Sequence, residues 1–309
     1  MRRFAPFFAL FCTFGVLSFA QEKLVVKTGP ARIPAFDQVK GLSSTIAQGD
    51  YERVVKDVKS HITLVRAQYV VEGHEVSAYV AHNRRQRGAL PVVILNRGGY
   101  VEAEPLPFVL PAMARLADAG FLVIAPMLRG SDKEPGRDEM GGAEFADLAA
   151  AVNNVNAFGE ADSQNIFMAG ESRGGIMTYL SLRAQLPIRA AAVWGAITDM
   201  GEYLSQVDPQ GKLRHAVWPN FDEQKSSILE TRSALTFVDD LKAPLLIMHG
   251  GADRTVSPLH SLRLATKLQQ RGREYELHIF AGDNHVLRDH QEERDRCVVD
   301  WFRKHEVKH

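Results

Sequence analysis

The stretch Gly170-Glu171-Ser172-Arg173-Gly174 lies between a short apolar segment, residues 165–169, and a helix-like segment, residues 175–185. The pattern G-x-S-x-G is common, so by itself it also fits a glycine-rich turn with a capping serine. What distinguishes it here is the expected order of strand, turn and helix. Such a turn needs glycines where the backbone folds back on itself, and it exposes the serine hydroxyl at the positive end of the helix. The rest of the chain decides between these interpretations.

Short apolar segments alternate with amphipathic segments along most of the chain. Residues 91–95 and 121–125 are wholly apolar, which is typical of strands buried on both faces of a sheet. Residues 62–71 and 76–81 are expected to form a hairpin around Glu72-Gly73-His74. This order predicts an α/β protein, with a mainly parallel central sheet, an antiparallel start and helices on both faces. The other expected strands are 165–169, 190–193, 244–248 and 275–280, and the expected helices are 106–119, 143–157, 175–185, 258–271 and 291–304.

A serine nucleophile needs a base, and that base needs a carboxylate to orient it. Asp253 follows the expected strand 244–248 in a glycine-containing loop, and His285 follows the expected strand 275–280 in another loop. The carboxyl ends of parallel strands meet at one edge of a sheet. We therefore expect Ser172, Asp253 and His285 to lie together, in the chain order that the α/β-hydrolase fold uses. The alternatives are that Asp253 caps the next helix and that His285 is a surface residue.

Four other residues compete for the acid and histidine roles. Asp239 and Asp240 precede the strand that leads to the candidate acid, and Asp283 and His290 flank His285. We rank them lower because they do not lie one loop beyond a strand end, or because they fall within an expected helix. Asp283 and His285 also have residue types that bind metals, but no second cluster with ligand spacing accompanies them. The sequence therefore predicts no metal site and no cofactor.

A tetrahedral oxyanion needs two hydrogen-bond donors. The first candidate is the backbone N–H of Arg173, the residue after the candidate nucleophile. The second is expected from the loop after the strand 91–95, where Gly98 and Gly99 permit close approach of the backbone. The alternative for this glycine pair is a simple turn.

The side chain of Arg173 is a separate question, because a charge beside the turn is costly unless it is paired or solvated. Asp138 and Glu139 belong to a loop that we expect at the same end of the sheet. Our hypothesis is that Arg173 is held by Asp138 or Glu139. The alternative is that Arg173 points into the cleft and meets the substrate.

The bulk composition limits the partners. The chain has 309 residues, with 37 Lys and Arg against 37 Asp and Glu. This length suits one large domain or two modest ones. The balanced charge provides no field that attracts nucleic acid or an anionic membrane, so we expect no nucleic-acid partner.

The first twenty residues differ from the rest. Arg2 and Arg3 precede an apolar run, residues 4–19, and the segment ends in Ser18-Phe19-Ala20, with small residues where a signal peptidase reads them. This predicts a signal peptide over residues 1–20 and a periplasmic or secreted protein, with no membrane contact after cleavage. The alternative is an uncleaved membrane anchor, for which the run is short.

The remaining chain is expected to comprise an N-terminal arm, residues 21–58, and a catalytic domain, residues 59–309. Residues 199–241 join two core strands and are too long for a plain connection. They form either a partial lid over the candidate serine or a cap whose aromatic side chains pack with one another. Cys297 is the single cysteine outside residues 1–20, so we expect no intramolecular disulfide in the mature chain. The sequence does not predict an oligomeric state.

Together these segments resemble the catalytic domain of the prolyl oligopeptidase family of serine peptidases. The resemblance covers about residues 60–309 and includes a second glycine after the G-x-S-x-G turn. It implies an α/β-hydrolase fold and an acyl-enzyme mechanism with Ser172, Asp253 and His285. The segments that carry it are residues 170–179, Asn96-Arg97-Gly98-Gly99, Arg129-Gly130-Ser131, residues 138–143 and Arg232-Ser233-Ala234.

The chain departs from the family in two respects. Larger members carry a β-propeller that screens substrates by size, whereas fewer than 60 residues precede the hydrolase strands here. Some members also place an oxyanion-donating tyrosine just before the glycine pair; here that residue is Arg97, and Tyr100 follows the pair. The second oxyanion donor is therefore either a backbone N–H near Gly98 or the phenol of Tyr100.

These features lead to three functional expectations. The first is a peptidase that acts on small peptides, as the resemblance implies. The second is a carboxylesterase that acts on small esters, because the same groups cleave esters more easily and no size filter is visible. The third is a non-catalytic binding protein on a hydrolase fold.

Overall fold

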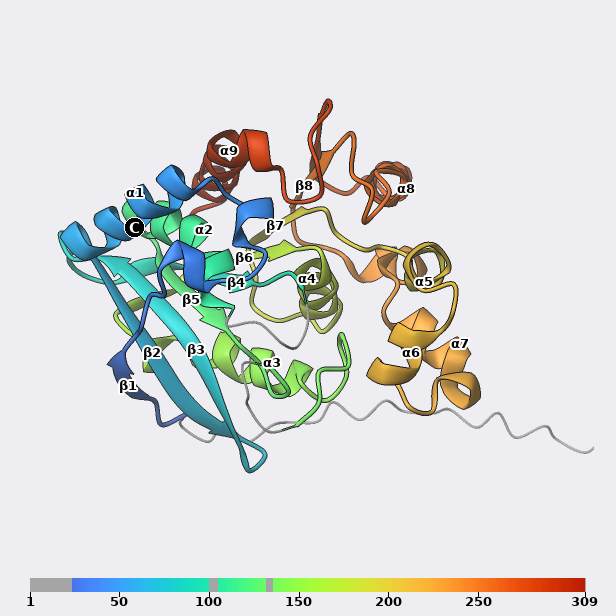
Figure 1. Cartoon of the computed structure of the whole chain (residues 1–309), viewed down its shortest axis with the longest axis horizontal. Coiled ribbons are helices and arrows are strands. Elements are labelled where there is room, and N and C mark those ends of the chain that lie inside the picture. Colours follow the sequence, from blue (N-terminus) through green and yellow to red (C-terminus); the bar gives the residue numbers. More distant parts are fainter. Residues whose placement is uncertain (1–23, 100–104, 132–135, 309) are drawn as a thin grey trace, which may run out of the picture.

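A computed structural model describes residues 24–99, 105–131 and 136–308. Within these residues the chain forms a nine-stranded mixed sheet in the order β1-β2-β3-β5-β4-β6-β7-β8-β9 (Figure 1). The predicted α/β-hydrolase fold, with a mainly parallel sheet and helices on both faces, is confirmed. The strands are β1 (Lys27–Pro30), β2 (Ile62–Val71), β3 (His74–Asn83), β4 (Leu90–Asn96), β5 (Leu122–Pro126), β6 (Ala161–Glu171), β7 (Ala190–Trp194), β8 (Leu245–Gly250) and β9 (Tyr275–Phe280).

The sheet has an antiparallel start and a parallel remainder. β2 and β3 form the expected hairpin, whose two-residue turn has positive φ at Glu72 (50°) and Gly73 (80°), as a tight hairpin turn requires. β3 also pairs antiparallel with β5. The remaining neighbours, β5 with β4, β4 with β6, β6 with β7, β7 with β8 and β8 with β9, are parallel. The N-terminal arm also joins the sheet, because β1 pairs antiparallel with β2. β1 has only four residues and no apolar alternation, so the sequence pattern does not predict it as a strand.

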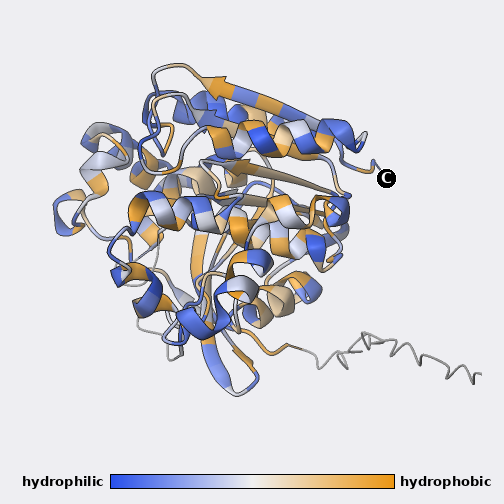
Figure 2. Cartoon of the chain, turned by 90° about the vertical axis from the view of Figure 1, so that its right-hand side faces the viewer, coloured by the Kyte–Doolittle hydropathy of each residue, from blue (hydrophilic) through white to orange (hydrophobic). Residues whose placement is uncertain are grey.

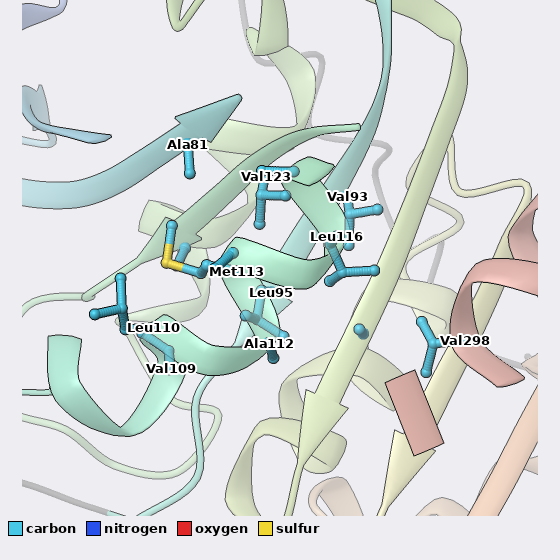
Figure 3. Packing of buried hydrophobic residues seen from close by; sticks show 14 of the residues in the cluster. Ala81, Val93, Leu95, Val109, Leu110, Ala112, Met113, Leu116, Val123 and Val298 are labelled. Carbon is cyan, nitrogen blue, oxygen red and sulfur yellow. The ribbon is translucent and has the colours of Figure 1, made fainter. Parts of the chain in front are cut away.

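Helices cover both faces because their apolar sides pack on the sheet while their polar sides meet solvent (Figure 2). One apolar cluster joins α1, α2 and α9 to the sheet, and a second joins α3, α4 and α8 to the opposite face. Figure 3 shows Leu110, Met113 and Leu116 of α2 within the first cluster. The bounds are α1 (Gln48–His61), α2 (Leu106–Asp118), α3 (Phe145–Asn153), α4 (Arg173–Arg183), α8 (Leu259–Gln270) and α9 (Gln291–Lys304).

The long connection from β7 to β8 contains three further helices, α5 (Met200–Val207), α6 (Lys212–Val217) and α7 (Phe221–Thr231). They gather on the side of the molecule away from the β2–β3 hairpin (Figure 1). Trp218 and Phe221 pack there with ring centroids 6.0 Å apart, in an apolar cluster that also includes Ile176 of α4 and Val256. The aromatic side chains thus hold this cap together and pack it against α4 and Val256. Its role as a lid stays a prediction.

Residues 1–20, the predicted signal peptide, lie outside the described residues. Among the described residues, no helix combines the length and the apolar character that a bilayer span requires. Cys297 on α9 is half-buried against the first apolar cluster and is a free thiol, and burial raises its pKa.

Candidate active site

Ser172 occupies a strained turn between β6 and α4. Its backbone has φ 52° and ψ −116°, a combination that a residue with a side chain adopts only where its surroundings enforce it. The backbone N–H of Ser172 donates to the carbonyl oxygen of Trp194 at the end of β7, with a distance of 2.9 Å. This neighbouring strand therefore helps to hold the turn in its strained form. Such strain is a feature of the nucleophile turn of α/β-hydrolases.

The glycines of the turn are required by close approach of neighbouring atoms. A Cβ atom at Gly170 would lie 2.4 Å from the carbonyl oxygen of Gly174. At Gly174 it would lie 2.1 Å from the carbonyl oxygen of Asn96, and at Gly175 2.4 Å from the Cβ of Ala196. Each distance is far below a van der Waals contact, so a side chain at any of the three positions would displace backbone or a neighbouring strand end.

The structure brings the three residues of the expected triad together. The Oγ of Ser172 lies 2.9 Å from Nε2 of His285, and Nδ1 of the same ring lies 2.7 Å from Oδ2 of Asp253. The Asp253 side chain is fully buried, whereas the imidazole of His285 keeps 17% of its surface exposed. The three side chains come from the loops after β6, β8 and β9, as the strand order predicts. They form one line of hydrogen bonds, from the buried carboxylate of Asp253 to the hydroxyl of Ser172.

The carboxylate of Asp253 has more donors than the sequence suggests. Its Oδ1 accepts from the backbone N–H groups of Thr255 (2.8 Å) and Val256 (2.9 Å). Its Oδ2 lies 3.0 Å from Nε2 of His249 as well as near His285. Burial acts to raise the pKa of this carboxyl, but the hydrogen bonds from His249 and His285 outweigh it and hold the pKa far below its usual range. Asp253 is therefore ionised at neutral pH.

His249 is a further residue that contacts the carboxylate of Asp253, and the sequence did not predict it. It is the penultimate residue of β8 and is fully buried. Its Nε2 lies 3.0 Å from the carbonyl oxygen of Val256, which can only accept, so Nε2 carries the proton and also donates to Asp253. Its Nδ1 then accepts from the hydroxyl of Ser261 at 2.7 Å. A histidine at the end of a strand, just before the loop that holds the acid, was the available signal.

The four competing residues are engaged elsewhere. The carboxylate of Asp283 binds Nδ1 of His290 at 2.8 Å. Asp239 pairs with Arg271 at 2.8 Å, and Asp240 lies 3.8 Å from a guanidinium nitrogen of Arg183. No hydrogen bond or ion pair joins any of these acids to His285 within the described residues.

The loop after β4 lies directly against the nucleophile turn. The carbonyl oxygen of Asn96, at the start of this loop, packs against Gly174 of the turn. Farther along the loop, a Cβ at Gly98 would lie 2.8 Å from Oε1 of Glu171. Arg173 opens α4, so its backbone N–H lies at the helix N-terminus beside Ser172. The backbone of Gly98 and Gly99 is thus close enough to the turn to supply a second oxyanion donor, and this role stays a prediction. Tyr100, the other candidate donor, lies outside the described residues.

Asp138 is confirmed as a partner of Arg173. Nε of the guanidinium donates to Oδ1 of Asp138 at 3.1 Å, and Nη2 donates to the same oxygen. Of the two acids expected, Asp138 is the one that pairs with Arg173, while the backbone carbonyl of Glu139 accepts from Trp218 and Arg232. The second acid near Arg173 is Glu144, whose Oε1 lies 3.5 Å from Nη2.

Glu144 is buried and also accepts from the backbone N–H groups of Gly141 (2.6 Å) and Gly142 (3.1 Å). Burial raises the pKa of its carboxyl above the usual range, with Arg173 opposing the shift and the neighbouring Asp138 adding to it.

Arg97 braces the loop that contains the glycine pair. Its Nη1 donates to the carbonyl oxygens of Gly98 (3.1 Å) and Gly99 (3.0 Å), and its Nη2 lies 3.4 Å from Oδ2 of Asp138. The carboxylate of Asp138 therefore ties the glycine loop to the nucleophile turn through two arginines. Arg97, at the position where some family members have a tyrosine, therefore stabilises the glycine loop in this chain.

In the part of the chain that the structure describes, no group of three or more His, Cys, Asp or Glu side chains is arranged to hold a metal ion.

Comparison with known proteins places the chain among the prolyl oligopeptidase family, which matches residues 110–308. The uncharacterized peptidase YtmA of Bacillus subtilis is 25% identical over 246 residues, which are 79% of this chain and 94% of that protein. Acylamino-acid-releasing enzyme 2 of Oryza sativa subsp. japonica is 25% identical over 214 residues, 62% of this chain and 27% of that enzyme.

A solved structure of the acylaminoacyl peptidase of Pyrococcus horikoshii has the same fold, with a TM-score of 0.68 at 18% identity over 84% of this chain and 44% of that one. The chain thus spans nearly all of YtmA but less than half of the Oryza sativa enzyme and of the Pyrococcus horikoshii peptidase. Because the family match extends over well over half of the chain, the protein belongs to the prolyl oligopeptidase family and is a serine hydrolase.

Proposed function

We propose that the protein is an exported serine peptidase that cleaves peptide bonds through an acyl-enzyme on Ser172. The observation that carries this proposal is the line of hydrogen bonds from Asp253 through His285 to the hydroxyl of Ser172. The strained backbone of Ser172 supports it, because the strain places the hydroxyl where a substrate can reach it.

In the first half of the reaction, Oγ of Ser172 attacks the carbonyl carbon of the scissile bond while its proton passes to Nε2 of His285. Asp253 accepts from Nδ1 of that ring, which fixes the tautomer and stabilises the imidazolium that forms. The tetrahedral intermediate collapses as the carbon–nitrogen bond breaks, and the imidazolium gives its proton to the leaving amine. The acyl group stays on Ser172 as an ester.

In the second half, water attacks the ester carbonyl and gives a proton to His285. The second tetrahedral intermediate collapses, the product acid leaves and the proton returns to Oγ of Ser172. In both halves the backbone N–H of Arg173 and a backbone N–H of the Gly98–Gly99 loop donate to the oxyanion, which is the largest single contribution in comparable enzymes.

We propose peptides rather than esters as substrates, because the relatives that match most of the chain are named as peptidases. YtmA matches nearly along its whole length, and the acylaminoacyl peptidases share the fold. The test is a panel of peptide p-nitroanilides against p-nitrophenyl esters of matched acyl groups. Turnover of the anilides that is lost in Ser172→Ala supports the peptidase. Turnover confined to the esters would make the protein a carboxylesterase.

Export rests on the charged and apolar start of the chain, Arg2 to Ala20. The intact mass of protein recovered from the exported fraction should correspond to a chain that begins at Gln21. A mass that retains residues 1–20 would show an anchor in place of a cleaved signal.

A further inference from the structure

A partly open cavity of about 190 Å³ lies beside the nucleophile turn, on the α2 and α9 side of the sheet. Gly98 and Gly99 of the glycine loop border it together with Glu171, the residue before Ser172. The cap helices α5 to α7 contribute no residue to this cavity among the described residues that line it. It is therefore a recess next to the reacting groups that is separate from the region under the cap.

Most of the cavity wall is apolar. Leu95 of β4 and Phe108, Val109 and Ala112 of α2 supply it, and Figure 3 shows Leu95, Val109 and Ala112 in the layer between this helix and the sheet. An occupant of this recess needs an apolar stem, because burying a polar chain against such a wall would leave its hydrogen bonds unmade.

Glu171 places a carboxylate in this apolar surrounding. Its Oε2 accepts from Nε1 of Trp194 at 2.8 Å, and its Oε1 faces the loop, 2.8 Å from where a Cβ on Gly98 would lie. Among the described residues, no hydrogen bond or ion pair reaches Oε1. The charge of Glu171 is thus stabilised by a single N–H donor.

The two cations that line the cavity contact other acids, which they share with further arginines, and neither forms a hydrogen bond or ion pair with Glu171 among the described residues. Arg97 lies 3.4 Å from Asp138 and donates to the glycine loop. Arg294 donates to Asp295 at 2.8 Å, and its guanidinium lies 4.6 Å from the centroid of the Trp194 ring. Within the described lining, no cation of the protein therefore pairs directly with the carboxylate of Glu171.

We propose that this cavity is a subsite for a cationic group on an apolar stem, such as a primary ammonium or a guanidinium, with Glu171 as the residue that selects it. The proposal deepens the proposed function, because it assigns the substrate a positive charge close to the scissile bond. An ammonium or guanidinium here donates a charge-assisted hydrogen bond to Oε1 of Glu171. It also offsets the repulsion that Glu171 would exert on an oxyanion formed beside Gly98, so it favours the transition state as well as binding.

The direct test is binding without turnover. Benzylammonium and its neutral analogue benzyl alcohol are titrated by calorimetry into the Ser172→Ala protein, and into the same protein with Glu171→Gln or Glu292→Gln. Glutamine keeps an acceptor for the Trp194 N–H. Glu292 is a matched control because its side chain on α9 is 80% exposed.

We expect the cation to bind at least about tenfold more tightly than the alcohol, which is the scale of a hydrogen bond to a charged group. The preference should disappear in Glu171→Gln and persist in Glu292→Gln. Equal affinities of the two compounds, or a preference that survives Glu171→Gln, would overturn the proposal.

A kinetic test then locates the cation relative to the scissile bond. On the acyl side, N-acetyl-lysine and N-acetyl-norleucine p-nitroanilides are compared. On the leaving-group side, one acyl group is joined to lysine amide or to norleucine amide. A kcat/KM preference for the charged member in one pair, lost in Glu171→Gln, identifies the side. Equal kcat/KM values within both pairs would contradict the proposal.

The peptidase proposal and the cation-subsite proposal can be rejected independently of each other. If a fluorophosphonate leaves Ser172 unmodified while benzylammonium still binds through Glu171, the peptidase is rejected and the cation site stands. If Ser172 reacts and the charged and neutral compounds bind equally, the cation site is rejected and the peptidase stands.

Discussion

Arg173 and Asp138 form a buried ion pair directly behind the candidate nucleophile. The guanidinium donates twice to one carboxylate oxygen, and the side chains are 3% and 0% exposed. The second carboxylate oxygen faces Arg97 of the glycine loop. Three loops that the reaction needs in fixed positions, namely the turn, the glycine loop and the segment around Asp138, therefore share one carboxylate.

Removing either partner of this pair should destabilise the fold, because it leaves a buried charge without its counterion. We expect Arg173→Gln and Asp138→Asn each to lower the free energy of unfolding by about 3 kcal/mol or more. The double variant should lose clearly less than the sum of the two. Urea unfolding of the four proteins measures this. Glu139→Gln is the control, expected within about 0.5 kcal/mol of wild type; additive losses would reject the pair.

The close approach at Gly174 predicts that even a methyl group is not tolerated. In Gly174→Ala the new Cβ would lie 2.1 Å from the carbonyl oxygen of Asn96, so the turn and the glycine loop must separate. We expect a loss of stability on the order of 1–3 kcal/mol and a large loss of turnover. Gly49→Ala in α1 is the matched control, because nothing lies within 4 Å of its Cβ position. Similar stability of the two variants would contradict the packing described here.

The lowered pKa of Asp253 makes a prediction about acid stability. A carboxyl whose pKa is lower in the folded protein than in the unfolded chain, where it is about 3.9, contributes stability that is present above that pH. This contribution disappears as the pH falls through the lower folded pKa. Asp253→Asn should therefore be less stable than wild type at pH 7, and the difference should narrow below about pH 4. A difference that stays constant from pH 7 to pH 3 would count against the assigned direction.

His249 should act as a positioning residue for the acid. In His249→Phe the Asp253 carboxylate loses one of its N–H donors, and a hydrogen bond to a charged group is worth ~1.5–3 kcal/mol. We expect kcat to fall by roughly 10- to 100-fold with little change in KM. The acid limb of the pH–rate profile should move upward. Ser261→Ala, which keeps the imidazole, should have a smaller effect. An unchanged pH profile in His249→Phe would reduce His249 to a packing role.

Much of this architecture could be predicted from the sequence, because the apolar strands and the loops after them follow simple periodic rules. The positions of Ser172, Asp253 and His285 one loop beyond a strand end required only the strand order. Contacts between loops depend instead on side-chain reach and on bends that no local pattern encodes. Asp138 was predicted as a partner of Arg173 because its loop was expected at the same end of the sheet. The approach of Glu144 to Arg173 depends on side-chain reach, and it was not predicted.

Two other features show the same limit. β1 pairs with β2 through only four residues, too few for a period to be visible. His249 lies among apolar residues of β8, where a buried histidine looks like any core position until the carboxylate of Asp253 is placed beside it. Both features depend on tertiary contacts that no local pattern in the sequence encodes.

The central claim is that Ser172 is the nucleophile. Its most direct test is reaction of the purified protein with a fluorophosphonate, followed by mass spectrometry of the modified peptide. We expect one modified residue, Ser172, no labelling of Ser172→Ala, and a fall in turnover of roughly a million-fold in that variant. Labelling of another serine that persists in Ser172→Ala, with turnover retained, would contradict it.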